Sequence, residues 1–255
     1  MRSLFWIAAS LANTVVSLPT GPKTSEARSP HHPFEWSPDL ARYYSAVGRH
    51  ISDSRNEPVF NPVCDLLNAD MPQSGLDPPE DGLKLLHVVI GRGTQNYTCE
   101  GLSAEDEPEA TGAVATLFNA SCIASNYPDI LDMLPRIALQ FPNPPNDLLE
   151  PGNLMLAGHH FFDEEGVPVF DLGNGYAFVT KLDSVDAPLN ALAGQDNEGN
   201  GACPWLLLGQ KEDTTGNVKT VYRLNTAGGN PPATCADNDG EFTVEYAAQY
   251  WFWGV

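Results

Sequence analysis

Two adjacent histidines followed by acids are the residue types most able to do chemistry in this sequence. His159 and His160 occur in "GHHFFDEEG", where Asp163, Glu164 and Glu165 follow. Imidazole and carboxylate groups together are frequent metal ligands. Successive side chains of a strand point to opposite faces, so the two histidines would not hold one ion together, and His87 would join either only if the fold brought it near. We therefore interpret them as strand histidines beside an acidic turn and expect no metal and no other cofactor.

Hydrolytic chemistry has weaker support. The sequence has no Gly-x-Ser-x-Gly, the motif that presents a nucleophilic serine on a sharp strand-to-helix turn. Carboxylates that could form a glycosidase-like pair are numerous, for example Asp163, Glu164, Asp171 and Glu245. Solvation of an acidic surface accounts for most of them.

The last fifty residues concentrate aromatic side chains, namely Trp205, Tyr222, Tyr246, Tyr250, Trp251, Phe252 and Trp253. The final segment alternates cleanly, with Phe242, Val244, Tyr246, Ala248, Tyr250 and Phe252 on one face. That face is typical of a β-core. The other face carries Trp251 and Trp253 with Gln249 and Glu245. Such a polar-aromatic face predicts a surface that stacks on a glycan or lines a small-molecule pocket.

The residues that we expect at such a ligand site are Arg92, His160, Trp205, Arg223 and Trp251. Arg223 lies in "VYRLNT", a half-buried strand, and a buried arginine needs a carboxylate or a ligand. Consecutive strands are usually neighbours, so we expect Arg223 to lie near Trp251. The competing interpretation is that Arg223 pairs with Glu245 across the strands.

Two classes of function therefore stay open, a secreted binding module and an extracellular enzyme whose ionisable groups would be His160, Arg92 and Arg223. A flat aromatic face favours the binding module, and a cavity that holds both a histidine and an arginine favours the enzyme.

The chain begins like a secretory signal peptide, predicted over residues 1–17, with Arg2 followed by an apolar run from Leu4 to Ala12. That run is too short to span a bilayer, and no later segment is long enough. Secretion makes the sequons at Asn96 and Asn119 credible acceptors of N-linked sugar. It also makes the five cysteines candidates for disulfides rather than metal ligands.

The formal charge of −20 and a pI of about 4.4 bear on partners. So acidic a surface repels phosphate backbones and anionic lipids, which argues against nucleic acid as a partner. The oligomeric state cannot be inferred from the sequence.

The elements expected to position these residues fall into two parts. Residues 18–82 are a proline-rich leader with one helix over about 38–51, capped by Ser37, whose face Leu40, Tyr43, Tyr44, Val47 and Ile51 should pack on the domain. Residues 83–255 contain many short strands and one helical interruption near "YPDILDMLPRIAL". This pattern predicts a mainly β fold with a single antiparallel β-sandwich or barrel-like domain.

Several long motifs resemble a family of secreted fungal proteins with bacterial relatives, known as a domain of unknown function: "LKLLHVVIGRGTQNYTC", "GAVATLFNASC", "GHHFF" with "PVFDL", "VYRLNTAGGNPPATC" and "VEYAAQYWFW". The resemblance runs from about Cys64 to Trp253. It implies a secreted β-rich domain and no established activity. It also implies that Cys64, Cys99, Cys122 and Cys235 are the family's cysteines, which makes Cys203 the candidate unpaired thiol.

Fungal members often carry the label "malate dehydrogenase", and the residues argue against it. A nicotinamide site needs Gly-x-Gly-x-x-Gly between a strand and a helix, so that backbone amides hold the pyrophosphate. The nearest stretch, "GRGTQN" from Gly91 to Asn96, lacks the third glycine and leads into a sequon and a cysteine. We expect no nicotinamide binding.

For the disulfides we predict Cys99 with Cys122 and Cys64 with Cys235, leaving Cys203 free. Other pairings stay open, because connectivity cannot be read from sequence alone.

Overall fold

Strands dominate the structure, a computed structural model that describes residues 36–55, 63–143, 148–150, 152–192 and 200–255. The predicted signal peptide lies outside these residues. The strands of the described part are β1 (Lys84–Cys99), β2 (Glu109–Asn119), β3 (Leu148–Leu149), β4 (Leu154–Phe162), β5 (Pro168–Asp171), β6 (Tyr176–Val185), β7 (Trp205–Gln210), β8 (Val218–Gly228) and β9 (Gly240–Gly254). All of their pairings are antiparallel, so the predicted mainly β fold is confirmed.

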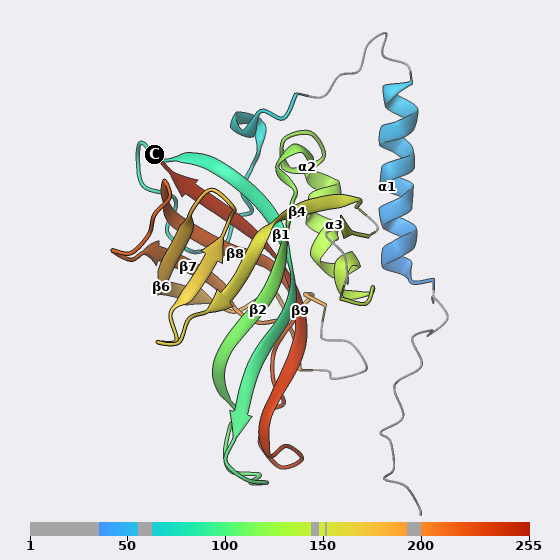
Figure 1. The fold of residues 1–255 in the computed structure, drawn as a ribbon. Coiled ribbons are helices and arrows are strands. Elements are labelled where there is room, and N and C mark those ends of the chain that lie inside the picture. Colours follow the sequence, from blue (N-terminus) through green and yellow to red (C-terminus); the bar gives the residue numbers. More distant parts are fainter. Residues whose placement is uncertain (1–35, 56–62, 144–147, 151, 193–199) are drawn as a thin grey trace, which may run out of the picture. The chain divides into compact units, whose positions relative to one another are not determined.

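These strands form one sheet in the order β2-β1-β9-β8-β7-β6-β5-β4-β3 within the described ranges. An additional pairing joins β2 to β4, with Ala115 opposite His160. The two ends of the sheet therefore meet, and the strands close into a barrel-like ring. Figure 1 shows β1, β2 and β9 as three long neighbouring strands.

The ring gives every strand an inner and an outer face. The inner face of β9 carries Tyr246, Tyr250 and Phe252, which belong to one buried cluster. Its outer face carries Ala247 and Trp251, which belong to a second buried cluster. The predicted alternation of β9 is confirmed, but both faces are buried, and the expectation of an open polar-aromatic face is wrong.

Helices and a connecting segment cover that outer face. The helical elements of the described part are α1 (Pro38–Ser54), the short 3₁₀ helix η1 (Leu66–Asn68), α2 (Ser121–Asn126) and α3 (Pro128–Leu139). The buried side of α3 joins the cluster that contains Trp251, and partly buried Leu66, Met71 and Leu76 pack against the same cluster. Figure 1 shows α2 and α3 beside the long strands.

The helix predicted over 38–51 is confirmed and extends to Ser54. The Ser37 hydroxyl accepts the Leu40 N–H at 3.1 Å, which satisfies one of the open donors at the helix start. Leu40 and Tyr43 are buried, as expected, and α1 packs on α3. Tyr44 and Ile51, expected on the packed face, are 42% and 49% exposed.

The disulfides join Cys64 to Cys122 and Cys99 to Cys235, and Cys203 is free. The predicted pairings of Cys99 with Cys122 and of Cys64 with Cys235 are both wrong, and the register of β1 and β2 explains why. Val89 lies opposite Asn119, so Cys122, just after β2, lies near Val89, whereas Cys99 is the last residue of β1. The ten residues from Val89 to Cys99 span about 33 Å, far beyond the roughly 7 Å that a disulfide can bridge.

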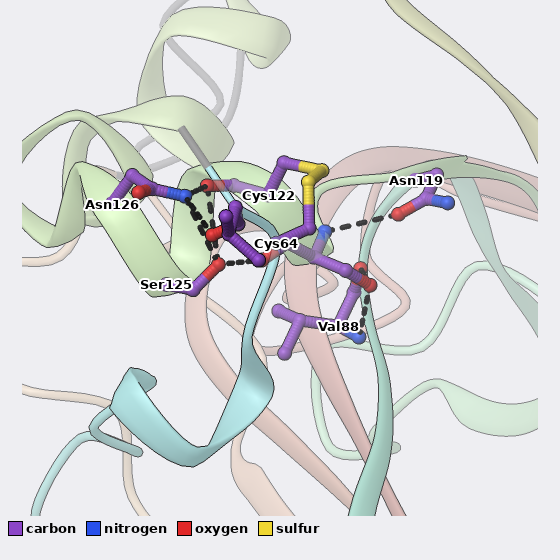
Figure 2. The surroundings of a disulfide bond; sticks show 8 residues. Cys64, Val88, Asn119, Cys122, Ser125 and Asn126 are labelled. Carbon is purple, nitrogen blue, oxygen red and sulfur yellow. Dashed lines mark hydrogen bonds between the residues drawn. A yellow bond between two sulfur atoms is a disulfide. The ribbon is translucent and has the colours of Figure 1, made fainter. Parts of the chain in front are cut away.

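Each bonded cysteine pairs with the cysteine that the strand register brings close to it. Cys99 lies opposite Gly240 of β9, so Cys235, just before β9, is close. Cys64 meets Cys122 in α2, where the Asn126 amide donates to the carbonyl oxygens of Val63 and Cys122. Figure 2 shows this disulfide with Ser125, Asn126 and Asn119 around it. It fastens the segment after α1 to the outer face of the sheet.

Candidate functional site

A cavity of about 220 Å³ lies on the outer side of the sheet, where α1 and α3 meet β7 and β8. We call it the Trp205 pocket. Its walls mix charged, polar and apolar side chains, from Asp39, Arg42, Asp132, Met133, Arg136, Ile137, Pro188, Asn190, Ala191, Trp205, Asn225 and Thr226.

A β-bulge shapes one wall of the pocket. The pairing of β8 with β9 shifts between Leu224 and Ala227, and Asn225 within that shift has φ of 47°. Asparagine is one of the few residues that tolerate this left-handed conformation. Its Nδ2 donates to the Asp132 carbonyl oxygen at 2.7 Å, which ties the bulge to α3. Bulges and strained backbone of this kind are common beside functional sites.

Trp205, at the start of β7, forms an apolar wall of the pocket and is 8% exposed. Its indole Nε1 is buried and has no hydrogen-bond partner among the described residues. An unmade buried hydrogen bond costs about 1–3 kcal/mol. Within the described residues, no hydrogen bond therefore holds the Trp205 ring in its orientation.

The charged groups of the pocket are unevenly paired. Asp39 forms ion pairs with Arg42 and with Arg136, the latter at 3.3 Å. Arg136 also donates to the Asn190 carbonyl oxygen. Asp132 is in no ion pair within the described part of the chain. Partial burial raises the pKa of Asp132, with a hydrogen bond from Gln249 acting in the opposite direction and the charge of Asp129 adding to the rise.

Of the residues expected at a ligand site, only Trp205 lines this pocket. Trp251 is 0% exposed, and its Nε1 donates to Gln249 Oε1 at 3.0 Å. Arg92, also on the outer face, pairs with Glu245 at 2.7 Å and donates to backbone carbonyl oxygens, including those of Ala138 and Phe141. These contacts tie α3 to the sheet, so they explain Arg92 as a structural residue.

The expectation that Arg223 lies near Trp251 on one face is wrong. β8 and β9 are neighbours, as predicted, but Arg223 lies opposite Tyr250, and Trp251 lies opposite Tyr222. Opposed residues share a face, so Arg223 is on the inner face and Trp251 on the outer one. The competing pair of Arg223 with Glu245 is also wrong, because Glu245 pairs with Arg92.

His160 shares the inner face with Arg223. His160 is 5% exposed, and its ring stacks on that of Phe170 with the two ring centroids 4.2 Å apart. Its Nδ1 hydrogen-bonds with the Val169 carbonyl oxygen at 2.8 Å. Burial lowers the pKa of His160 to about 4, with the Val169 contact opposing and the Arg223 charge reinforcing the shift. His160 is therefore neutral at ordinary pH.

Asp132, Arg136 and Asn225 belong to the pocket and were missed by sequence reasoning. Asn225 had a weak signal, because Asn before "TAGG" favours a left-handed turn. Asp132 and Arg136 had none, because their role depends on where α3 lies against β8.

The described ranges contain neither a metal-binding cluster nor a membrane-spanning helix. No group of three or more histidine, cysteine or acidic side chains is placed to hold a metal ion. No helix there combines the length and apolar character that a bilayer crossing requires.

Comparisons with known proteins give one match. No curated protein and no solved structure matches the chain. A family model described as "Protein of unknown function (DUF3455)" matches residues 79–254, which include every strand of the ring. The chain therefore belongs to the DUF3455 family, as a β module with two disulfides.

Proposed function

We propose that this protein is a secreted, disulfide-stapled β module that binds one small hydroxylated ring, such as a monosaccharide unit, in the Trp205 pocket. The observation that carries the proposal is the meeting of an ion-pair-free carboxylate, Asp132, with a buried indole and a strained Asn225 in one cavity. The Asp132 carboxylate suits a hydroxyl or ammonium donor on the ligand, and the Trp205 ring suits its apolar side.

The size of the pocket limits the ligand. Pockets for drug-sized molecules are roughly 300–1,000 Å³. A cavity of about 220 Å³ therefore suits one ring rather than an extended chain. Its two carboxylates and two guanidinium groups balance, so a neutral or zwitterionic ligand fits better than a multiply charged one.

Secretion and glycosylation belong to the same proposal. Two disulfides are typical of proteins that mature in oxidising compartments. Asn119 is exposed at the end of β2, and its Oδ1 accepts the Ser121 N–H at 3.0 Å, which leaves the amide nitrogen that carries N-linked sugar outward. Asn96 is half-buried within β1. We expect Asn119 to be glycosylated in preference to Asn96. Deglycosylation should then lower the mass of the unaltered protein but not that of the N119Q variant, which mass spectrometry can check.

The alternative, an enzyme that uses His160 and Arg223, has less support. Both side chains lie on the inner face, outside the Trp205 pocket, and His160 is stacked within the packed core.

The test is a titration of the secreted protein with monosaccharides, amino sugars and amino acids, followed by calorimetry and by saturation-transfer NMR. We expect Asp132→Asn to weaken binding about tenfold to a hundredfold, because a hydrogen bond to a charged group contributes roughly 1.5–3 kcal/mol. Asp213→Asn, a change of the same type in an exposed turn, should leave the affinity unchanged.

A second matched pair separates the pocket from the fold. Trp205→Phe should weaken binding, whereas Trp253→Phe should not, although both indole nitrogens are buried without a partner. The proposal fails if no compound of the panel binds, or if Asp132→Asn and Trp205→Phe both bind as the unaltered protein does.

A further inference from the structure

Arg223 is a buried cation on the inner face, remote from the Trp205 pocket. Its side chain is 8% exposed, and its Nε and Nη2 donate to the Pro204 carbonyl oxygen at 3.2 and 2.9 Å. Its Nη1 donates to Gln95 Oε1 at 3.2 Å. Within the described residues, no carboxylate forms an ion pair with it. The guanidinium is thus surrounded by neutral acceptors only.

The groups around Arg223 do not supply the missing charge. Burial raises the pKa values of the neighbouring Cys203 thiol and of the Tyr246 and Tyr250 phenols, so all three are neutral at ordinary pH. Burial alone would lower the pKa of Arg223, but these same groups act in the opposite direction and the net direction is upward. Among the described residues, no negative charge compensates the guanidinium, and burying an unpaired charge is costly.

Gln95 adds an unused donor beside this charge. The guanidinium only donates, so it fixes the Gln95 side chain with Oε1 toward Arg223. The amide nitrogen must then face elsewhere, and its Nε2 is buried with no hydrogen-bond partner in the described structure. The Arg223–Gln95 pair therefore contains both a buried cation and an N–H donor without an acceptor in the described structure.

We propose that Arg223 and the Gln95 amide bind a small monovalent anion of about halide size on the inner face of the ring. Such an anion would accept a hydrogen bond from Gln95 Nε2 and would balance the charge of the Arg223 guanidinium. The Tyr97 hydroxyl donates to the Gly229 carbonyl oxygen at 2.7 Å, and the Tyr246 and Tyr250 hydroxyls share a hydrogen bond of 2.8 Å. Of the three phenols, only one O–H of the Tyr246–Tyr250 pair therefore has no acceptor among the described residues.

Close packing limits the anion to a small one. A Cβ added at Gly229 would lie 2.9 Å from the Tyr246 Cβ and 3.1 Å from the Cys203 sulfur, so the inner face has little spare room here. Gln95 is only partly buried, so this side of the cluster lies near the surface.

The test compares thermal unfolding in sodium chloride with unfolding in sodium gluconate at equal ionic strength. Screening of surface charge is the same in both salts, and gluconate is too large for the site. We expect the midpoint to rise saturably with chloride alone. A chloride concentration one hundred times the Kd multiplies the folding equilibrium constant by about one hundred.

Gln95→Glu makes the test specific, because it supplies a permanent anion at the same place. This variant should be more stable than the unaltered protein in gluconate and should lose the response to chloride. Gln210→Glu, which adds the same charge at an exposed position, should keep that response. In crystals soaked in bromide, an anomalous peak should lie beside Gln95 Nε2, on the inner face of the ring.

Equal midpoints in the two salts would overturn the proposal and leave water as the partner of Gln95. A chloride response that survives undiminished in Gln95→Glu would overturn it too. None of these results depends on the Trp205 pocket, so this site and the proposed ligand site stand or fall separately.

Discussion

The inner and outer faces of the sheet bury their side chains by different means. Inside the ring, strands pack against strands so tightly that a Cβ added at Gly91 would lie 2.5 Å from the Tyr250 ring. Outside, α1, α3 and the segment around η1 provide the cover, and they leave a cavity of about 220 Å³. Among the described residues, the indole nitrogens of Trp205 and Trp253 also lack partners there, compared with the amide nitrogen of Gln95 on the inner face. A face covered by separate segments fits less completely, which explains why the cavity lies there.

The largest expected losses of stability come from removing the disulfides, one of which joins two ring segments while the other holds part of the outer cover. In the chain-entropy model the stabilisation grows with loop length, and the sequence separations are 136 residues for Cys99–Cys235 and 58 for Cys64–Cys122. Replacing both cysteines by serine should cost about 5 kcal/mol for the first pair and about 4 kcal/mol for the second, measured by urea unfolding.

Hydrogen exchange then assigns each bridge to its face. Loss of Cys64–Cys122 should raise exchange in η1 and α2, and loss of Cys99–Cys235 should raise it at the shared end of β1 and β9. A larger loss of stability for the shorter loop, with exchange spreading through the ring, would contradict this division.

Core truncations compare the packing of the two faces directly. Phe252→Ala removes a fully buried ring whose centroid lies 5.2 Å from that of Phe170. We expect the free energy of unfolding to fall by about 3–5 kcal/mol. Ile137→Ala on α3 enlarges a cavity that already exists, so its cost should lie near the lower end for such changes, about 2 kcal/mol. Equal costs in chemical unfolding would show that the faces are packed alike.

Acid should weaken the inner face through His160. Its pKa is lowered from 6.5 to about 4 in the folded protein, so the unfolded chain binds the proton more readily. Stability is unaffected above about pH 6.5 and falls as the pH drops toward 4, by on the order of 3 kcal/mol. His87, whose pKa burial also lowers, acts in the same direction.

Variants isolate the contribution of His160. Urea unfolding between pH 7 and pH 4.5 should show a shallower decline for His160→Phe. His159→Gln, at an exposed position of the same strand, should follow the unaltered protein. Parallel curves for all three proteins would place the acid sensitivity elsewhere.

The smallest expected effect concerns the outer cover. Ser37→Ala removes the cap of α1 and should cost about 1 kcal/mol. Because α1 lies over the Trp205 pocket, hydrogen exchange should rise in α1 while the ring strands keep their protection. Faster exchange throughout β8 and β9 would show that the cover and the ring unfold together.

Local patterns in the sequence were reliable predictors of local structure. The Ser37-Pro38 start predicted α1, and the alternation of β9 predicted which of its side chains share a face. The identity of the free cysteine also agreed with the family resemblance. The first two predictions depend only on residues within one element, and the third depends on the family resemblance.

What could not be predicted depends on how elements meet. The pairing of Cys99 needs the register of β1 with both β2 and β9, which no short pattern reveals. The face on which Arg223 lies depends on the exact register of β8 and β9, because a shift of one residue moves a side chain to the opposite face of the sheet. The Trp205 pocket needs the bulge at Asn225 and the docking of α3, so only its tryptophan was named in advance.

The position of β1 in the sheet has a consequence for how the chain is made. β1 lies between β2 and β9, and β9 is synthesised after the other strands of the ring. During synthesis the β1–β2 hairpin must therefore wait with one edge unpaired, the condition under which strands associate with wrong partners. Closing the ring joins segments about 150 residues apart, so folding should be slow and finish late. The Cys99–Cys235 bridge joins the end of β1 to the residue run that leads into β9, so its formation should report that β9 has docked beside β1.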